Sequence, residues 1–310
     1  MTSIFFNSPL DDEKRRNLLY SGDIFVYSTI PVAQAFVEFA REMIEAAFAP
    51  LDPQVAQHEL PVEEFAAILA KLKPAFIHHP KSKAFVGQML TELGCDPTKT
   101  YFDVPRMRTS TSHSYLTSGI SYAFHPHRDT WYSAAPCQLN WWFPIYDVEP
   151  DNVMAFHPHY WSQGVKNSSS CYNYYQWNAT SRQTAAQHVK QDTRVQPKPQ
   201  EEMELDPQIR IVSKPGDVMV FSAAQMHSTV QNTSGKTRFS IDFRTVHYED
   251  VVAKRGALNV DSECTGTALR DFLRITDLER IPEQAASLYD IETLSEGLLI
   301  YEPSTVVSAG

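Results

Sequence analysis

The sequence has no run of apolar residues as long as the roughly 20 residues that a membrane-spanning helix needs. Its first segment, Met1 to Arg16, reaches charged residues too early to contain the apolar core of a signal peptide. It has only four cysteines, which are widely separated and form no CxxC pair, and this indicates free thiols in a reducing compartment (Cys95, Cys137, Cys171, Cys264). These absences predict a soluble, cytoplasmic protein with no membrane partner.

Long basic runs are also absent, and the formal net charge is −10 with a sequence pI near 5.5. Such a chain is poorly suited to binding nucleic acid by neutralising phosphates, so we expect a small molecule as its partner. No Gly/Ser-rich or charged linker divides the chain, which predicts a single domain over residues 1–310. The sequence leaves the oligomeric state open.

The spacing of apolar residues divides this domain into three parts. Residues 1–100 show helical spacing, residues 101–250 consist of short β-prone runs between turns, and helices are expected again within 251–310. This pattern predicts a mainly β fold with flanking helices, in which a jelly-roll or double-stranded β-helix core of the cupin type carries N-terminal and C-terminal helical additions. Helices are expected at Pro31–Phe48, Pro61–Leu72 and Ser82–Leu93, and strands at Leu116–Phe124, Cys137–Tyr146, Asn152–Phe156, Ile209–Ser213, Asp217–Phe221 and Thr237–Val246.

Residues 160–207 interrupt the predicted core with an aromatic and polar stretch followed by a Gln/Lys/Pro-rich run. Long irregular insertions in compact domains are usually lids or disordered surface, and the aromatic half favours a lid. We expect Trp161 or Tyr175 to help enclose a substrate. Packing of these rings onto the barrel is an equal alternative.

The most specific functional motif is His127-Arg128-Asp129, followed by His227, 98 residues after Asp129. Residues two apart in an extended strand point to the same side, so His127 and Asp129 can reach one metal ion while Arg128 points away. Two imidazoles and one carboxylate are typical ligands of mononuclear non-heme iron(II), and they leave coordination positions open for a co-substrate and oxygen. The motif therefore predicts an enzyme that activates oxygen.

Arg238 lies 11 residues after His227, in the alternating segment Thr237–Val246. Its guanidinium can hold a carboxylate through two hydrogen bonds. Arg238, Ser240, Asp242 and Arg244 share one face of this segment. Inside a barrel they would face a ligand, whereas the alternative is a solvated face with the phenylalanines forming the core.

With these residues, the chain resembles the Fe(II)/2-oxoglutarate-dependent dioxygenases, and more closely their phytanoyl-CoA dioxygenase-like branch. The resemblance covers about residues 101–247. It departs from that branch at Val153, where the branch has glycine, and in the loop His157–Trp161. The matching features, in order, are the HxD of His127 and Asp129, the segment Asp147–Gly164, the turn Pro215-Gly216-Asp217, and His227 with Asn232 and Arg238.

The resemblance implies Fe(II) as cofactor, with 2-oxoglutarate and O2 as co-substrates. His127, Asp129 and His227 would be the metal-binding catalytic residues, and Arg238 would bind the far carboxylate of 2-oxoglutarate. Oxidative decarboxylation to succinate and CO2 would be coupled to oxidation, by default hydroxylation, of an unactivated C–H bond in a small molecule of specialised metabolism. Desaturation, epoxidation or cyclisation by the same oxidant stay open, and the alternative of another class is a non-oxidative metal-dependent cupin, either an isomerase or a binding protein.

Further residues are assigned to ligand binding by their positions. Gln138 and Asn140 occupy alternate positions of the strand Cys137–Tyr146, and one of them is expected to hydrogen-bond the co-substrate. Trp131 and Arg244 are candidates for substrate contact, together with Trp161 and Tyr175. A polar or carboxylate-bearing metabolite would suit Arg244 and the arginines Arg106 and Arg108.

Overall fold

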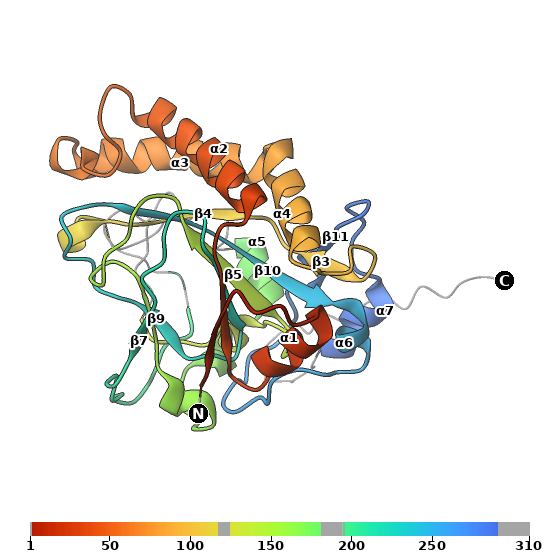
Figure 1. Ribbon diagram of the computed structural model, residues 1–310. Helices are drawn as coiled ribbons and strands as arrows, with labels where there is room; N and C mark the ends of the chain where they lie inside the picture. Colours follow the sequence, from red (N-terminus) through yellow and green to blue (C-terminus); the bar gives the residue numbers. More distant parts are fainter. Residues whose placement is uncertain (1, 117–124, 181–193, 195, 291–310) are drawn as a thin grey trace.

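The computed structural model describes residues 2–116, 125–180, 194 and 196–290. Over this part of the chain, two β-sheets pack face to face, and helices cover the outer face of the larger sheet (Figure 1). The expectation of a β-rich core flanked by helices is confirmed. None of the helices in these ranges combines the length and apolar character needed to cross a membrane.

The larger sheet is built around the long strand β10, and all of its pairs are antiparallel except β1–β2. Its strand order is β1-β2-β8-β5-β10-β3-β11, and β4 pairs with β10 on the same edge as β3. These strands are β1 (Ile4–Phe6), β2 (Ile24–Tyr27), β3 (Thr100–Phe102), β4 (Arg106–Ser110), β5 (Leu139–Pro144), β8 (Val218–Ser222), β10 (Arg238–His247) and β11 (Leu273–Arg274).

The smaller sheet has the order β7-β6-β9, with β6 (Met154–Phe156) between β7 (Ile209–Arg210) and β9 (His227–Thr229). Its apolar side chains pack against those of the larger sheet in one cluster, in which Phe156 meets Phe221 with ring centroids 5.0 Å apart. The two sheets therefore enclose an interior layer between them.

Three helices cover the outer face of the larger sheet, namely α2 (Pro31–Phe48), α3 (Val62–His78) and α4 (Pro80–Glu92). All three were predicted from apolar spacing, although α3 continues past Pro74 to His78. Phe36 and Phe48 of α2 pack against Phe143 and Phe239 of the sheet, at ring-centroid distances of 5.8 and 6.0 Å. The other α-helices are short: α1 (Asp12–Leu19), α5 (Tyr174–Thr180), α6 (Tyr248–Val252) and α7 (Glu283–Ala286).

The structure shows whether the polar face of β10 points into the interior or to solvent, which the sequence left open. Phe239, Ile241 and Phe243 are fully buried among the covering helices, in one cluster with α2 and α3. Arg238, Ser240, Asp242 and Arg244 therefore point to the opposite face, which is the interior between the sheets. Trp142, which is paired with Asp242 in the sheet, packs in the intersheet cluster and confirms this direction.

Several expectations need correction. The N-terminal part is not wholly helical, because β1 and β2 form one edge of the larger sheet. Within residues 251–290 only α7, β11 and single helical turns follow α6, so the expected helical C-terminal part is sparse there. The expected strand Leu116–Phe124 lies outside the described residues after Leu116, as do residues 181–193 of the insertion and the final segment 291–310.

Candidate functional site: a His-Asp-His metal centre

The structure brings His127, Asp129 and His227 together, with one possible ligand atom from each lying within 4.8 Å of the others. Asp129 Oδ1 is 3.4 Å from His127 Nε2 and 4.0 Å from His227 Nε2. Ligands bound to one divalent ion at about 2.0–2.2 Å lie roughly 3 Å apart, so small side-chain rotations would complete the coordination. The three residues therefore fit one metal ion.

Main-chain hydrogen bonds position the three ligands. His127 N donates to His227 O at 2.9 Å, and His227 N donates to His127 O at 3.0 Å, which joins the two ligand segments directly. Asp129 begins a 3-10 turn rather than continuing a strand, and its N–H donates to Ala223 O at 2.9 Å. The side chains of His127 and Asp129 still point to the same side, as predicted, because Arg128 between them is extended, at φ −110° and ψ 143°.

The two imidazoles are oriented in the same way. His127 Nδ1 lies 2.8 Å from His125 O, and His227 Nδ1 lies 3.0 Å from Gln225 O. A carbonyl can only accept, so these contacts assign the proton to each Nδ1 and leave each Nε2 with a lone pair directed at Asp129. His125 itself faces Pro197 O through Nε2 at 2.8 Å, so it supports the site rather than acting as a ligand.

The electrostatics of the centre favour the metal-binding protonation states. Burial would raise the pKa of Asp129, but its interactions with His127, His227 and Arg244 outweigh burial and lower that pKa. Burial and the neighbouring His127 lower the pKa of His227 to about 4. At neutral pH the centre therefore offers a carboxylate and a neutral imidazole, which is the state that binds a cation.

Arg238 is nearly fully buried on the inner face of β10. Its Nη1 donates to Asn152 O at 2.8 Å, and its guanidinium carbon lies 5.7 Å from the centre of the Trp142 ring. Burial lowers its pKa to about 10, so it stays charged at neutral pH. Within the described residues Arg238 forms no ion pair with a carboxylate, and the buried Nε of Arg238 and Oγ of Ser240 have no hydrogen-bond partner. Sequence reasoning placed Ser240 on this face but gave it no role.

Gln138 and Asn140 also face the interior. Gln138 Nε2 donates to Asn140 Oδ1 at 3.1 Å, and the buried Gln138 Oε1 has no partner within the described ranges. Ala223 N donates to Gln138 O at 3.0 Å, and Ala223 O accepts from Asp129 N. Ala223 therefore connects Gln138 to the turn that carries Asp129. Asn140 lies opposite Arg244 in the sheet.

Three of the four predicted substrate residues have packing roles. Trp131 is fully buried against Tyr160 and Met226, with Nε1 donating to Asp261 at 2.7 Å, so it has no surface to offer a substrate. Tyr175 hydrogen-bonds Asp290 and Arg270, which connects α5 to the C-terminal segment.

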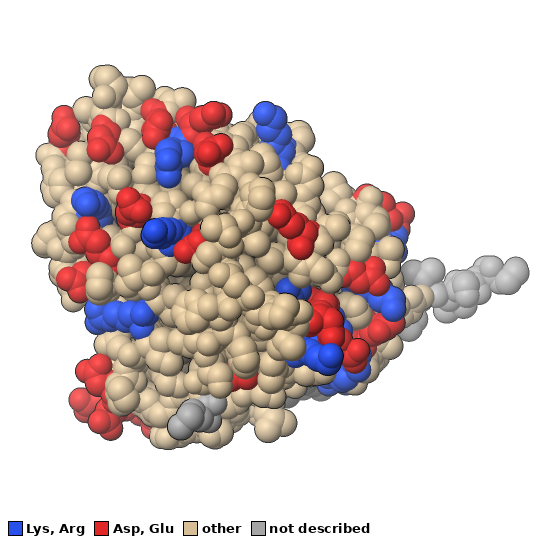
Figure 2. All heavy atoms as spheres, viewed as in Figure 1, with Lys and Arg blue, Asp and Glu red and all other residues tan. Residues whose placement is uncertain are grey.

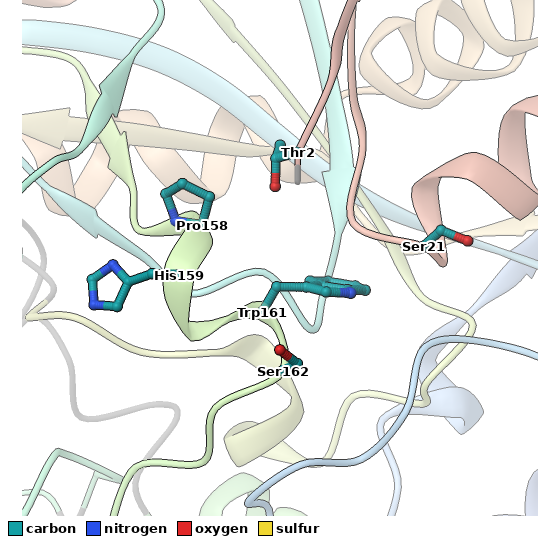
Figure 3. A pocket seen from close by; sticks show the side chains of 6 residues that line it. All are labelled: Thr2, Ser21, Pro158, His159, Trp161 and Ser162. Carbon is teal, nitrogen blue, oxygen red and sulfur yellow. The ribbon is translucent and has the colours of Figure 1, made fainter.

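Trp161 lies against Gly22, where an added Cβ would fall 2.7 Å from its ring. It lines a surface hollow of about 450 Å³ rather than the metal centre (Figure 3). The packing alternative therefore describes these aromatic residues better than substrate contact.

Arg244 lies on the interior face of β10, and its positive charge contributes to the lowered pKa of Asp129. Its Nε donates to Asp103 Oδ2 at 2.6 Å, and its N–H donates to Asp103 Oδ1 at 2.7 Å. On the other side of the metal-bearing turn, Arg128 pairs with Asp261. Sequence reasoning missed Asp103 and Asp261, because neither stands in a motif and Asp261 is 133 residues from its partner.

No family model matches the sequence, and no characterised protein matches it in a sequence comparison. One solved structure with a distant likeness is EvdO2 from Micromonospora carbonacea var. aurantiaca, which has also been solved with 2-oxoglutarate. The TM-score is 0.42 and the sequence identity 12%, and the match covers 77% of this chain and 91% of EvdO2. Another is the non-heme α-ketoglutarate-dependent epimerase SnoN from nogalamycin biosynthesis, at TM-score 0.37, 12% identity, 76% of this chain and 84% of that one. At 12% identity and TM-scores below 0.5, these likenesses assign no function to this chain.

Proposed function

We propose that the protein is an Fe(II)/2-oxoglutarate-dependent oxygenase whose two facing sheets form a double-stranded β-helix. The observation that carries the proposal is a pair of buried polar atoms, Arg238 Nε and Ser240 Oγ, which have no hydrogen-bond partner among the described residues and lie on the interior face together with the metal triad. A buried cation costs free energy unless an anion pairs with it, so this position favours a carboxylate ligand. A cupin isomerase with the same triad has no need of such a residue.

The residues of the chain divide the work of binding. His127, Asp129 and His227 would hold the iron, and Arg238 with Ser240 would hold the far carboxylate of 2-oxoglutarate by charge-assisted hydrogen bonds. Gln138 and Asn140, which face the same interior, are proposed to contact the co-substrate between these ends. Asn232 donates to Ser110 O and Lys236 O, both at 2.8 Å, and so fixes the turn that leads into Arg238.

Bound iron would supply the redox chemistry, in which O2 and 2-oxoglutarate give succinate and CO2 while a substrate C–H bond is oxidised, by default to an alcohol. Desaturation, epoxidation and cyclisation are further outcomes of the same chemistry. We place the chain in the phytanoyl-CoA dioxygenase-like branch on the order of its HxD, PGD and HxxxxN-plus-arginine motifs. Residues 160–207 are proposed as the lid over a small-molecule substrate.

The test is anaerobic addition of Fe(II) and then 2-oxoglutarate to the metal-free protein, followed by the weak visible charge-transfer band of an iron-bound 2-oxo acid. We expect the band in the wild type and its loss in Asp129→Ala. Arg238→Ala should raise the 2-oxoglutarate concentration at half-maximal band about 10- to 100-fold, because charge-assisted hydrogen bonds contribute roughly 1.5–3 kcal/mol. Arg210→Ala, which changes a more exposed arginine on β7, serves as the matched control.

Two outcomes would overturn the proposal. If Fe(II) binds but 2-oxoglutarate produces no band, the protein is better described as a non-oxidative cupin. If the band forms equally well in Arg238→Ala, another residue holds the far carboxylate.

A further inference from the structure

A row of aromatic rings leads away from the metal ligand His127. The centroid of its ring lies 5.5 Å from that of Tyr132, which closes the short turn that Asp129 begins. The Tyr132 ring lies 5.4 Å from that of Tyr172, and the Tyr172 ring lies 5.9 Å from that of Trp177 on α5. These separations are within the range of aromatic rings in contact. The row therefore connects the metal-bearing turn to a helix of the insertion.

The row runs from the metal centre to a ring that solvent can reach. Tyr172 in its middle is 5% exposed, whereas Tyr132 at the metal end and Trp177 at the other end are half-buried. The guanidinium carbon of Arg194 lies 5.2 Å from the centre of the Trp177 ring. A positive charge at that distance favours the return of an electron to the ring after an oxidation. Trp177 is therefore the place where a small molecule in solution could deliver electrons to the row.

The two ligand histidines differ in their aromatic neighbours. The ring of His227 lies 5.1 Å from that of Phe221 and 6.3 Å from that of Phe156. Tyrosine and tryptophan give up an electron far more readily than phenylalanine does. The row beside His127 thus offers a path for electrons that the phenylalanines beside His227 do not offer.

We propose that Tyr132, Tyr172 and Trp177 carry oxidising equivalents from the metal centre to the surface when no substrate is bound. The inference rests on the proposed function, which supplies the oxidant. Met226, next to His227 in the chain, is fully buried, and conversion of a buried methionine to its sulfoxide disrupts packing. The row would therefore protect the centre from damage by an oxidant that has met no substrate.

The electrons and protons of this step balance. An unproductive cycle converts 2-oxoglutarate and O2 to succinate and CO2, and the oxygen atom that a substrate would have received is released as water. That release takes two protons from solvent and two electrons, which travel inward from Trp177 through Tyr172 and Tyr132. Two molecules of a one-electron reductant replace the electrons that Trp177 has lost. Figure 2 shows basic and acidic side chains intermixed on one face of the molecule, so that face offers no patch of one charge to a redox protein, which favours a small-molecule reductant.

The first test uses the full chain with Fe(II), 2-oxoglutarate and O2 but no substrate, and ferrocyanide is the reductant. We expect close to two ferricyanide per succinate in the wild type. Tyr132→Phe and Trp177→Phe keep an aromatic ring but remove the oxidisable group, so each should lower this yield at least fivefold. Trp161→Phe changes a half-buried tryptophan outside the row and should leave the yield unchanged. Without ferrocyanide, mass spectrometry should find added oxygen on Trp177 in the wild type and on Met226 in Tyr132→Phe.

The second test needs no iron and therefore separates failure of the row from failure of the proposed function. In the Zn(II)-loaded protein, azide radicals produced by pulse radiolysis oxidise accessible tryptophan. Electronic contact along the row works in both directions, so the absorbance of the indole radical should decay as that of a tyrosine radical grows. Trp177→Phe should suppress this growth, and Trp161→Phe should not.

Growth of the tyrosine radical that is unaffected by Trp177→Phe would overturn the inference, as would an unchanged ferricyanide yield in Tyr132→Phe or Trp177→Phe. An equal loss of yield in Trp161→Phe would also overturn it, because electrons would then enter outside the row. If the wild type forms no succinate, the proposed function is refuted, and pulse radiolysis still decides whether the row conducts.

Discussion

Arg128 lies between two metal ligands yet points away from them into a buried ion pair with Asp261. Its Nε lies 3.1 Å from both carboxylate oxygens of Asp261, its Nη1 donates to Ala224 O at 2.6 Å, and its Nη2 donates to Gln163 O at 2.9 Å. Asp261 also accepts from Trp131 Nε1 at 2.7 Å. The pair thus joins the metal-bearing turn, the loop after β6 and the C-terminal segment.

We predict that Arg128→Met lowers the free energy of unfolding by about 3–5 kcal/mol, because it leaves the Asp261 carboxylate buried without its cation. That is a large fraction of the roughly 5–15 kcal/mol by which a domain is usually stable. In Arg128→Met/Asp261→Leu neither charge is left alone, so the double variant should lose less than the sum of the two single losses. Metal affinity should also fall in Arg128→Met, because the turn that carries Asp129 would lose the hydrogen bonds of Arg128 to Ala224 O and Gln163 O.

The measurement is urea unfolding of the metal-free protein followed by tryptophan fluorescence, with metal binding titrated separately. Lys99→Met is the matched control, because it breaks the solvent-exposed pair of Lys99 with Glu249 and should change stability little. A loss below about 1 kcal/mol in Arg128→Met would refute the reasoning. Strict additivity in the double variant would refute it as well, since it would show that the two side chains do not interact.

Two further predictions concern stability. Burial lowers the pKa of Lys73, which donates to Thr109 Oγ1 at 2.9 Å, to about 7. The unfolded chain keeps this proton to a higher pH than the folded chain does, so the free energy of unfolding should rise between pH 7 and about 10. Lys73→Met should remove that rise and increase the free energy of unfolding at pH 7 by on the order of 2–4 kcal/mol. Unchanged pH slopes in urea unfolding would contradict this. Gly256 has φ +154°, and an added Cβ would lie 2.6 Å from Cys137 N, whereas a Cβ on Gly235 would meet no atom within 4 Å. Gly256→Ala should therefore lower Tm by several degrees more than Gly235→Ala does. Equal losses of Tm would show that the close contact at Gly256 relaxes freely.

The sequence predicted those parts of the site whose geometry depends on a few neighbouring residues of the chain. His127 and Asp129 converge because Arg128 is extended between them, and the inward direction of Arg238 follows from the period of two in β10. The helix Pro31–Phe48 was predicted with both its ends, because its apolar spacing is regular and its proline occupies the first turn.

The parts that could not be predicted depend on distant partners. β1 and β2 are only three and four residues long, and β2 joins the sheet through β8, where Phe25 is paired with Val220. The partnership of Asp261 with Arg128 has no local signal. The aromatic residues of the insertion were assigned to substrate because a ring that packs and a ring that binds look alike in sequence, and Trp161 became distinguishable only through its contact with Gly22.

Both ligand histidines take their orientation from a carbonyl two positions earlier in the chain, at His125 and at Gln225. These acceptors belong to the main chain, so the choice of coordinating nitrogen does not depend on the identity of any neighbouring side chain. Sequence drift at positions 125 and 225 can therefore proceed without changing which nitrogen faces the metal. Insertions or deletions that shift the backbone by one residue cannot be tolerated in the same way, which makes the spacing around each histidine more constrained than the residues that fill it.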